Sequence, residues 1–341
     1  MILAGDIGGT NTRLAIVQRD DGGQLRIVVE STFKSAQYEG LHLIVREFLE
    51  SRDDRPQAAC FGVAGPVHEN RCRTTNLSWI VDAADLAADS HIPHVAVIND
   101  LEANGHGISC LEERDLFVLN PGDPKAAGHG AVVSPGTGLG EAGLFWNGSR
   151  YIPIPTEGGH TDFGPRTPLE YELGQYLTAK FGHVSYERVV SGPGLVNIYQ
   201  FLLDTGRGTQ PDWLAAELPE ADDKAAVISN AGMAGKCPAC EWALDIFMSL
   251  FGAEAGNVAL TFMARGGVWL GGGIVVKILP RLKSTPHFLD GFTSKGRLRR
   301  VLERIPVRVI LNDKTALLGA AKFAYSMLQE DSSDSAGLSL A

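Results

Sequence analysis

The 341-residue sequence lacks several features that mark whole classes of protein. No stretch approaches the roughly 20 apolar residues that a membrane span needs, since runs such as 268–270 and 273–276 are short and interrupted by glycine. No basic, apolar leader precedes the first predicted strand, which starts at Ile2. Positive charge is in deficit, because 30 Lys and Arg stand against 40 Asp and Glu, a net charge of −10. We therefore predict a cytoplasmic protein that binds neither membranes nor nucleic acid.

Cysteine is scarce, and the best-known nucleotide-binding signature is missing. The five cysteines are an odd number in a long chain, which disfavours a disulfide framework. Cys237 and Cys240 form an unaccompanied C-x-x-C, so zinc or redox chemistry there is also disfavoured. The sequence has no G-x-x-x-x-G-K-[ST], so any nucleotide must bind to another kind of phosphate loop.

Glycine, in contrast, is abundant, and its 40 residues cluster in a few loops. The first cluster, residues 5–10, lies between two apolar segments, 2–6 and 12–19, that are predicted strands. This arrangement favours a phosphate clamp, because glycines let backbone N–H groups crowd around a phosphate. A carboxylate repels phosphate, so the predicted role of Asp6 is to hold a hydrated Mg²⁺.

Two further glycine clusters follow. Segment 130–146 again reads as strand, Gly/Thr turn and strand, with residues 136–138 in the turn. We interpret the two hairpins as an internal duplication that holds both ends of a triphosphate. The third cluster, 271–273, lies between a predicted strand and a predicted helix. It either permits close strand–helix packing or offers a flat surface for an adenine ring.

A pair of polar residues ends the predicted strand 94–98. Asn99 and Asp100 follow this strand directly, and a helix is predicted from Leu101 onward. The pair either caps that helix or lines a ligand site, since ligands bind at the C-terminal ends of strands in open α/β sheets. In a site, the carboxylate could accept the proton of an attacking hydroxyl.

Another polar group lies in segment 156–163, where Glu157 and His160 flank two glycines. A lone His is usually a structural hydrogen-bonding group. The two side chains together on a glycine turn favour a grip on a polyol, because sugars need dense hydrogen bonding. Glu187 is a weaker candidate, since a Glu in a helical segment is usually solvated.

The order of predicted elements indicates an α/β chain with two units. Strands begin the first unit and then alternate with helices. The second unit starts near Phe117 and is mostly helical between 169 and 263. We expect the last strand and the helix 315–328 to fold back onto the first unit. The predicted parts are a small domain of 1–110 plus 300–328, a large domain of 111–299 and a disordered tail of 329–341.

Taken in order, these motifs resemble the bacterial-type glucokinase family, in the superfamily of actin-like proteins, sugar kinases and heat-shock ATPases. The resemblance covers about residues 2–325. It implies a homodimer with a two-domain actin-like ATPase fold, a duplicated ribonuclease H-like α/β fold with a cleft between the domains. The stretches that carry it are 5–11, 98–100, 134–140, 157–160, 185–188, 191–194 and 271–273.

The resemblance also implies a reaction, the phosphorylation of glucose at its 6-hydroxyl by MgATP. By motif, Asp100 resembles the family's catalytic base. The implied glucose ligands are Asn99, Asp100, Glu157, His160 and Glu187. The implied ATP-binding residues are Gly5, Asp6, Ile7, Gly8, Gly9, Thr10, Gly136, Thr137, Gly138 and Gly272. The sequence departs from the family pattern at Glu141, where an uncharged residue is expected, and at 312–315.

Three other functions compete with this one. A sugar-binding regulator without catalysis would carry an N-terminal helix-turn-helix, for which a strand starting at Ile2 leaves no room. A chaperone-like or filament-forming ATPase would not need the polar turn 157–160. A kinase that uses another donor, such as ADP or polyphosphate, or another hexose is compatible with every motif.

Overall fold

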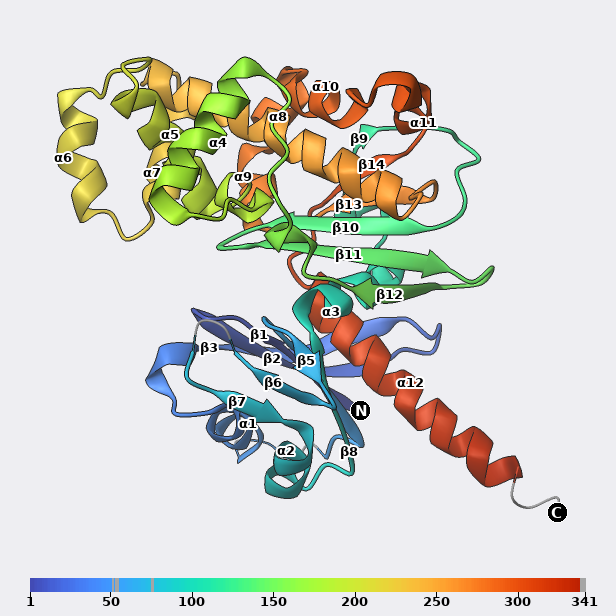
Figure 1. The fold of residues 1–341 in the computed structure, drawn as a ribbon. Coiled ribbons are helices and arrows are strands. Elements are labelled where there is room, and N and C mark those ends of the chain that lie inside the picture. The colour runs from blue at the N-terminus through green and yellow to red at the C-terminus, as the bar shows by residue number, and fades with distance from the viewer. Residues whose placement is uncertain (51, 53–54, 75–76, 338–341) are drawn as a thin grey trace. The chain divides into compact units, whose positions relative to one another are not determined.

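The computed structural model describes residues 1–50, 52, 55–74 and 77–337, which fold into two units. The first comprises Met1–Glu113, Ser149–Pro155 and the chain from Asn312 onward, and the second comprises Arg114–Gly148 and Thr156–Leu311. Each unit contains a β-sheet with helices packed on it (Figure 1).

The sheet of the first unit has the strand order β3-β2-β1-β4-β8. β1 (Ile2–Ile7), β2 (Asn11–Arg19) and β3 (Leu25–Lys34) form an antiparallel meander. β4 (Ala58–Val63) and β8 (His94–Asn99) continue the sheet parallel to β1. β1, β2 and β8 agree with the predicted segments 2–6, 12–19 and 94–98.

The register of these strands positions two of the predicted motifs. Ile7, Val63 and Asn99 are paired across β1, β4 and β8. The glycine turn that follows Ile7 and the helix that follows Asn99 therefore both start at the C-terminal edge of the parallel strands. In open α/β sheets this is the edge where ligands bind.

Side chains of β1 alternate between two apolar cores. Leu3 packs with the apolar face of α1 (Leu41–Glu50), whereas Ile2 and Ala4 pack with α12 (Thr315–Gly337) on the opposite face. The α12 core is rich in alanine, so helix and sheet approach closely. The first unit also contains β5 (Val67–His68), β6 (Arg71–Arg73), β7 (Ile80–Asp82), α2 (Ala83–Ser90) and α3 (Asp100–Gly107).

α12 also packs directly on α3, and two glycines make this possible. A Cβ on Gly319 would collide with the carbonyl oxygen of Ala103, and a Cβ on Gly107 would collide with the carbonyl oxygen of Thr315. The two helix backbones therefore touch at these positions. The helix that begins with Asp100 is thus supported by the C-terminal helix of the chain.

The second sheet has the strand order β12-β11-β10-β13-β14-β9. β10 and β11 form an antiparallel hairpin, and β13 and β14 continue parallel to β10. The order β11-β10-β13-β14 repeats the order β2-β1-β4-β8 of the first sheet, as an internal duplication predicts. The strands are β9 (Leu116–Asn120), β10 (Gly130–Pro135), β11 (Leu139–Trp146), β12 (Tyr151–Pro155), β13 (Gly267–Leu270) and β14 (Val307–Ile310).

Helices make up most of the rest of the second unit. They form a large apolar core with the inner face of the sheet, which includes Val133, Val268 and Leu270. The helices are α4 (Pro168–Phe181), α5 (Gly192–Asp204), α6 (Asp212–Glu220), α7 (Lys224–Met233), α8 (Pro238–Thr261), α9 (Gly273–Ser284), α10 (His287–Thr293) and α11 (Arg299–Glu303).

α8 is the core helix of this unit. Within the described residues it is the one helix long and apolar enough to cross a membrane by length and composition, which the short apolar runs had not suggested. Its most apolar 18-residue window is 78% buried inside the protein. Burial of this kind is what a central helix of a large apolar core requires.

Two expectations for the C-terminal region are wrong. β14 does not return to the first unit, because it pairs with β13 and β9, so residues 300–311 lie with the second unit. Residues 329–337 are helical, since α12 runs to Gly337, and extending an existing helix costs less than starting one. The last four residues of the predicted tail, 338–341, lie outside the described residues.

The contact between α3 and α12 can be tested with one methyl group. We expect Gly319→Ala to lower the free energy of unfolding by about 1–3 kcal/mol, because the added Cβ overpacks the interface. Thermal or denaturant unfolding measures this loss. Gly22→Ala is the control, since its Cβ meets only an ordinary contact in an exposed turn, and its effect should stay within about 0.5 kcal/mol. Equal stability of the two variants would contradict the proposed close packing.

Candidate functional site

The first glycine turn joins β1 to β2 and is closed by short hydrogen bonds. The Gly8 N–H donates to the Asn11 carbonyl at 3.0 Å, and the Ser35 hydroxyl donates to the Gly8 carbonyl at 2.8 Å. Gly9 is half-buried and Thr10 is exposed. The tip of the turn therefore presents its backbone to solvent, as a phosphate loop requires.

Two residues of the predicted loop lie inside the strand instead. Gly5 is buried in β1, and a Cβ there would lie 2.5 Å from the Phe61 ring. The Ile7 side chain is 2% exposed and belongs to the core under α1. Both residues shape the strand end, and only the backbone of Ile7 reaches the turn.

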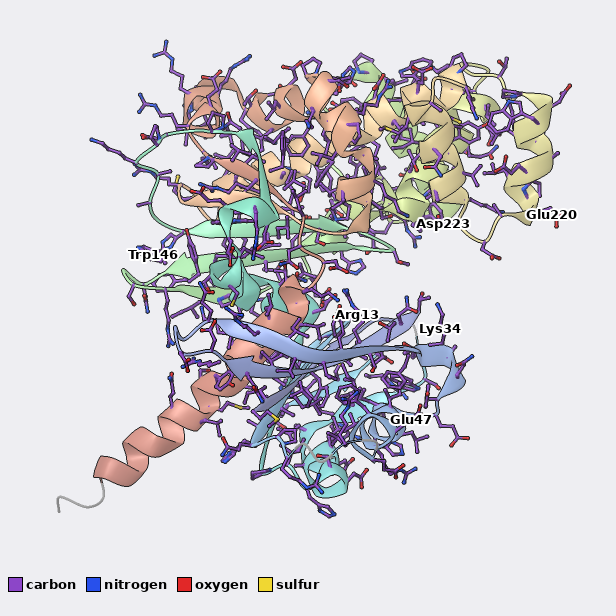
Figure 2. All side chains as sticks on the ribbon, turned by 180° about the vertical axis from the view of Figure 1, so that it is seen from behind. Arg13, Lys34, Glu47, Trp146, Glu220 and Asp223 are labelled. Carbon is purple, nitrogen blue, oxygen red and sulfur yellow. The ribbon has the colours of Figure 1, made fainter. Side chains whose placement is uncertain are left out.

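Asp6 lies near the end of β1, opposite Arg13 on β2, which is labelled in Figure 2. Arg13 Nη2 is 2.8 Å from Asp6 Oδ2, and Arg13 Nη1 is 3.1 Å from Asp313 Oδ2. Within the described part of the chain only Oδ2 of Asp6 is engaged, which leaves Oδ1 for a cation. Mg²⁺ is commonly held by one or two carboxylates together with substrate phosphates, so Asp6 fits such an ion.

Asn99, and not Asp100, is the N-cap of α3. Asn99 Oδ1 accepts hydrogen bonds from the N–H groups of Leu101 (2.9 Å) and Glu102 (3.4 Å), and Asn99 Nδ2 donates to the Gly65 carbonyl at 3.1 Å. Asp100 is the first residue of the helix and is half-buried, with Oδ1 3.0 Å from the Leu101 N–H. Its carboxylate lies at the helix end where the dipole attracts negative charge. Capping is therefore present, and both residues stay predicted site residues.

The second glycine turn joins β10 to β11 and is held by Glu187. Glu187 lies in the 3₁₀-helix η5 (Tyr186–Arg188), and its Oε2 accepts a hydrogen bond from the Leu139 N–H at 3.0 Å. A Cβ on Gly138 would lie 2.5 Å from the same oxygen, so a larger residue there would displace the Glu187 carboxylate. Glu187 is half-buried and partnered, which corrects the interpretation of it as a solvated helical residue.

The tip of this turn is anchored to the start of α5. The Gly136 N–H donates to the Gly138 carbonyl at 2.8 Å, and the Gly136 carbonyl accepts from the Gly192 N–H at 2.8 Å. Thr137 is exposed between them. The turn is thus fixed on both sides and leaves its outermost residue free to meet a ligand.

The third glycine cluster packs against the base of the second turn. The Gly271 N–H donates to the Val133 carbonyl at 3.0 Å. Gly272 has a φ of +87° and approaches the Pro135 carbonyl so closely that no Cβ fits. Close strand–helix packing is therefore present. Gly272 and Gly273 are also exposed at the start of α9, so a surface for an adenine ring stays a prediction.

The polar turn 157–160 contains the 3₁₀-helix η4 (Gly158–His160). The His160 Nε2 and Glu157 Oε2 atoms are 3.9 Å apart, and both side chains are more than half exposed. A Cβ on Gly159 would collide with the carbonyl oxygen of Leu139, and a Cβ on Gly158 would collide with Oε2 of Glu141. The two glycines therefore allow the backbone of this turn to lie directly on β11.

Leu139 brings three separate motifs together in the second unit. Its N–H binds Glu187, its carbonyl oxygen contacts Gly159, and it follows the glycine turn directly. The sequence predicted the second hairpin, the polar turn and Glu187 as candidates. It carries no signal that they meet, because they are far apart along the chain.

Sequence reasoning missed the buried carboxyl pair beneath the polar turn. Glu141 is 4% exposed and Glu254 is 3% exposed, and both lie inside the second unit. Only the departure of Glu141 from the family pattern drew attention to this position. Cys237 and Cys240 are also buried, and no cluster of three or more His, Cys, Asp or Glu suited to a metal occurs in the described ranges.

Comparison with known proteins agrees with these features. The family model described as Glucokinase matches residues 3–327. A glucokinase from Nostoc punctiforme is 41% identical over 334 residues, which cover 94% of this chain and 98% of the relative.

Comparison with solved structures also finds glucokinases. The crystal structure of a glucokinase from an Antarctic psychrotroph has a TM-score of 0.82 and 31% identity, covering 95% of this chain and 98% of the other. The Balamuthia mandrillaris glucokinase, solved with glucose, has a TM-score of 0.79 at 24% identity, covers 95% and 93% of the two chains, and supports the fold alone. With a family model spanning nearly its whole length and relatives above 30% identity, this chain belongs to the glucokinase family and has its two-domain actin-like fold.

Proposed function

We propose that this protein transfers the γ-phosphoryl group of ATP to the 6-hydroxyl of glucose. One observation carries the proposal: a glycine turn of the kind that binds phosphate and a polar turn of the kind that binds a polyol meet at Leu139. A donor held by the first and an acceptor held by the second would bind next to each other. Membership of the glucokinase family supports the same reaction.

Asp100 is the proposed general base. Its carboxylate lies at the start of α3, at the sheet edge from which the first glycine turn also emerges. In the reaction it orients the sugar 6-hydroxyl and takes its proton as the oxygen attacks the γ-phosphorus. General-base catalysis of this kind typically contributes about 10²–10⁴-fold to the rate.

The proposed glucose ligands are Asn99, Asp100, Glu157, His160 and Glu187. Glu157 and His160 are exposed, so their polar atoms are available to sugar hydroxyls. Asn99 keeps one Nδ2 hydrogen after its bond to Gly65, and Glu187 keeps Oε1 after its bond to Leu139. Asn99 and Glu187 therefore retain hydrogen-bonding capacity for the sugar while their other atoms fix their positions.

The proposed ATP site consists of the two glycine turns, with Gly272 on the adenine side. Thr10 and Thr137 mark the exposed tips of the turns. Asp6, restrained by Arg13, would hold Mg²⁺, which when bound neutralises phosphate charge. We further propose a cytoplasmic homodimer, as the family resemblance implies, and light scattering of the purified protein measures its mass directly.

The role of Asp100 is tested by Asp100→Asn. Because the amide cannot accept the hydroxyl proton, we expect kcat for glucose-dependent ADP formation to fall about 10²–10⁴-fold. Asp89→Asn is the matched control, since Asp89 is exposed on α2 of the same unit. A purified, folded Asp100→Asn variant with near-normal kcat would show that Asp100 is not the general base.

The same assay with a panel of sugars and donors separates the competing functions. We expect glucose to stimulate ADP release from MgATP more strongly than mannose or glucosamine. Binding of glucose without any ADP release would favour the regulator, and ATP hydrolysis independent of sugar would favour the chaperone-like ATPase. Transfer from ADP or polyphosphate, but not from ATP, would identify another donor.

The dual role of Glu187 predicts a difference between two substitutions. Glu187→Gln keeps an acceptor for the Leu139 N–H but loses charge toward the sugar, so the KM for glucose should rise about tenfold or more while the KM for ATP changes little. Glu187→Ala also leaves the Leu139 N–H without its acceptor, so both KM values should rise. If the two variants behave alike, Glu187 does not support the turn.

A further inference from the structure

A buried acid supports the polar turn from below. Glu141 lies in β11 opposite Val133, and its side chain is 4% exposed. The Thr156 hydroxyl donates to the Glu141 carbonyl at 2.9 Å, and Oε2 of Glu141 lies against Gly158. Among the described residues, Oε1 of Glu141 has no hydrogen-bond partner. Gly158 therefore rests on the Glu141 side chain, and Thr156 is bonded to the backbone of the same residue.

The partner of Glu141 is a second buried acid, Glu254 of α8. Both carboxyl groups are buried and lie close enough to interact, and two such carboxylates do not both stay charged, so one of them carries a proton. Burial raises the pKa of Glu254 as well, but hydrogen bonds from Asn257 Nδ2, at 2.8 Å, and from Tyr186 act in the opposite direction, so Glu254 is the better-stabilised anion of the two. Burial, and then the charge of Glu254, raise the pKa of Glu141 to about 9, so Glu141 holds the proton.

The network continues to the segment that contains Glu187. Tyr186 precedes Glu187 in η5, and its hydroxyl accepts a hydrogen bond from Asn257 Nδ2 at 3.0 Å. The Tyr186 N–H donates to the Thr161 carbonyl at 3.0 Å, one residue after the polar turn. The same buried cluster thus contacts both segments that carry proposed sugar ligands.

Cations on neighbouring elements face this cluster. Lys295 donates to the Ala253 carbonyl at 2.8 Å and to Asn257 Oδ1. Burial and the nearby Arg166 lower the pKa of Lys295 to about 8. Arg166 itself is paired with Glu170 at 2.7 Å. The cluster therefore contains a protonated Glu141 and a charged Glu254 near a cation.

We propose that Glu141 is a positioning residue for glucose binding. By donating its proton to Glu254, it holds the polar turn 157–160 on β11 in the conformation that binds the sugar. The proposal rests on the proposed function, since it assigns this turn to glucose. When Glu141 loses its proton, two buried carboxylates face each other, and repulsion drives Glu141 away from Glu254 and against Gly158. The turn is then displaced, and glucose binds less tightly.

The test compares wild type, Glu141→Gln and Glu141→Ala between pH 7 and pH 9.5. Hydrogen–deuterium exchange of the 156–161 peptide, corrected for the intrinsic exchange rate, measures how well the backbone N–H groups of the turn are protected in the free protein. We expect wild type to lose protection as the pH passes about 9, and the KM for glucose to rise with it. Glu141→Gln cannot ionise, so its protection and its KM for glucose should stay flat with pH.

Glu141→Ala removes the support at every pH. We expect low protection of the turn throughout and a KM for glucose raised about tenfold, with the KM for ATP within about twofold of wild type. Lys295 titrates in the same range in all three proteins, so the difference between wild type and Glu141→Gln isolates Glu141. Glu217→Gln, an exposed carboxylate on α6, is the control for charge removal.

Two results would overturn the proposal: identical pH profiles for wild type and Glu141→Gln, or a turn that stays protected in Glu141→Ala. If the wild-type protein shows no glucose-dependent ADP formation, the proposed function fails instead. The exchange measurement still decides whether Glu141 holds the turn, because it needs no substrate.

Discussion

The geometry of the second unit depends on the approach of one backbone segment to another. Gly158 and Gly159 lie against Glu141 and Leu139 at distances that a Cβ would not permit. Because the turn lies flat on β11, its flanking side chains project from a fixed base. The same strand start binds Glu187 through the Leu139 N–H. The relation between the second glycine turn and the polar turn is therefore set by glycines that permit close approach, together with the hydrogen bond of Glu187.

In the first unit, a helix holds the corresponding residue in place. Asp100, the proposed general base, is the first residue of α3, where Asn99 satisfies the first backbone N–H groups. α3 is held in turn by α12, whose backbone touches it at Gly107 and Gly319. Small residues thus provide rigidity in both units, because close backbone contact leaves little room for movement.

Much of this was predictable because it is local. Glycine turns between apolar segments predict hairpins from a few adjacent residues, and both hairpins occur where the sequence places them. The repeated hairpin also predicts the repeated sheet order. Contacts such as Glu187 with Leu139, or Glu141 with Glu254, join residues that are distant in sequence, and no periodicity reports them. The sequence did not decide which residue of the pair 99–100 caps α3, because Asn and Asp are equally good caps and adjacent.

The path of the chain has a consequence for how the protein is made. The first unit starts the sequence, but its sheet keeps one face, with Ile2 and Ala4, uncovered until α12 packs on it. That helix follows the whole second unit in the sequence, so it leaves the ribosome later than the second unit does. The inserted part of the chain can therefore fold before the sheet of the first unit is covered. Until α12 has emerged and packed, that alanine-rich face is a surface for chaperones or for aggregation.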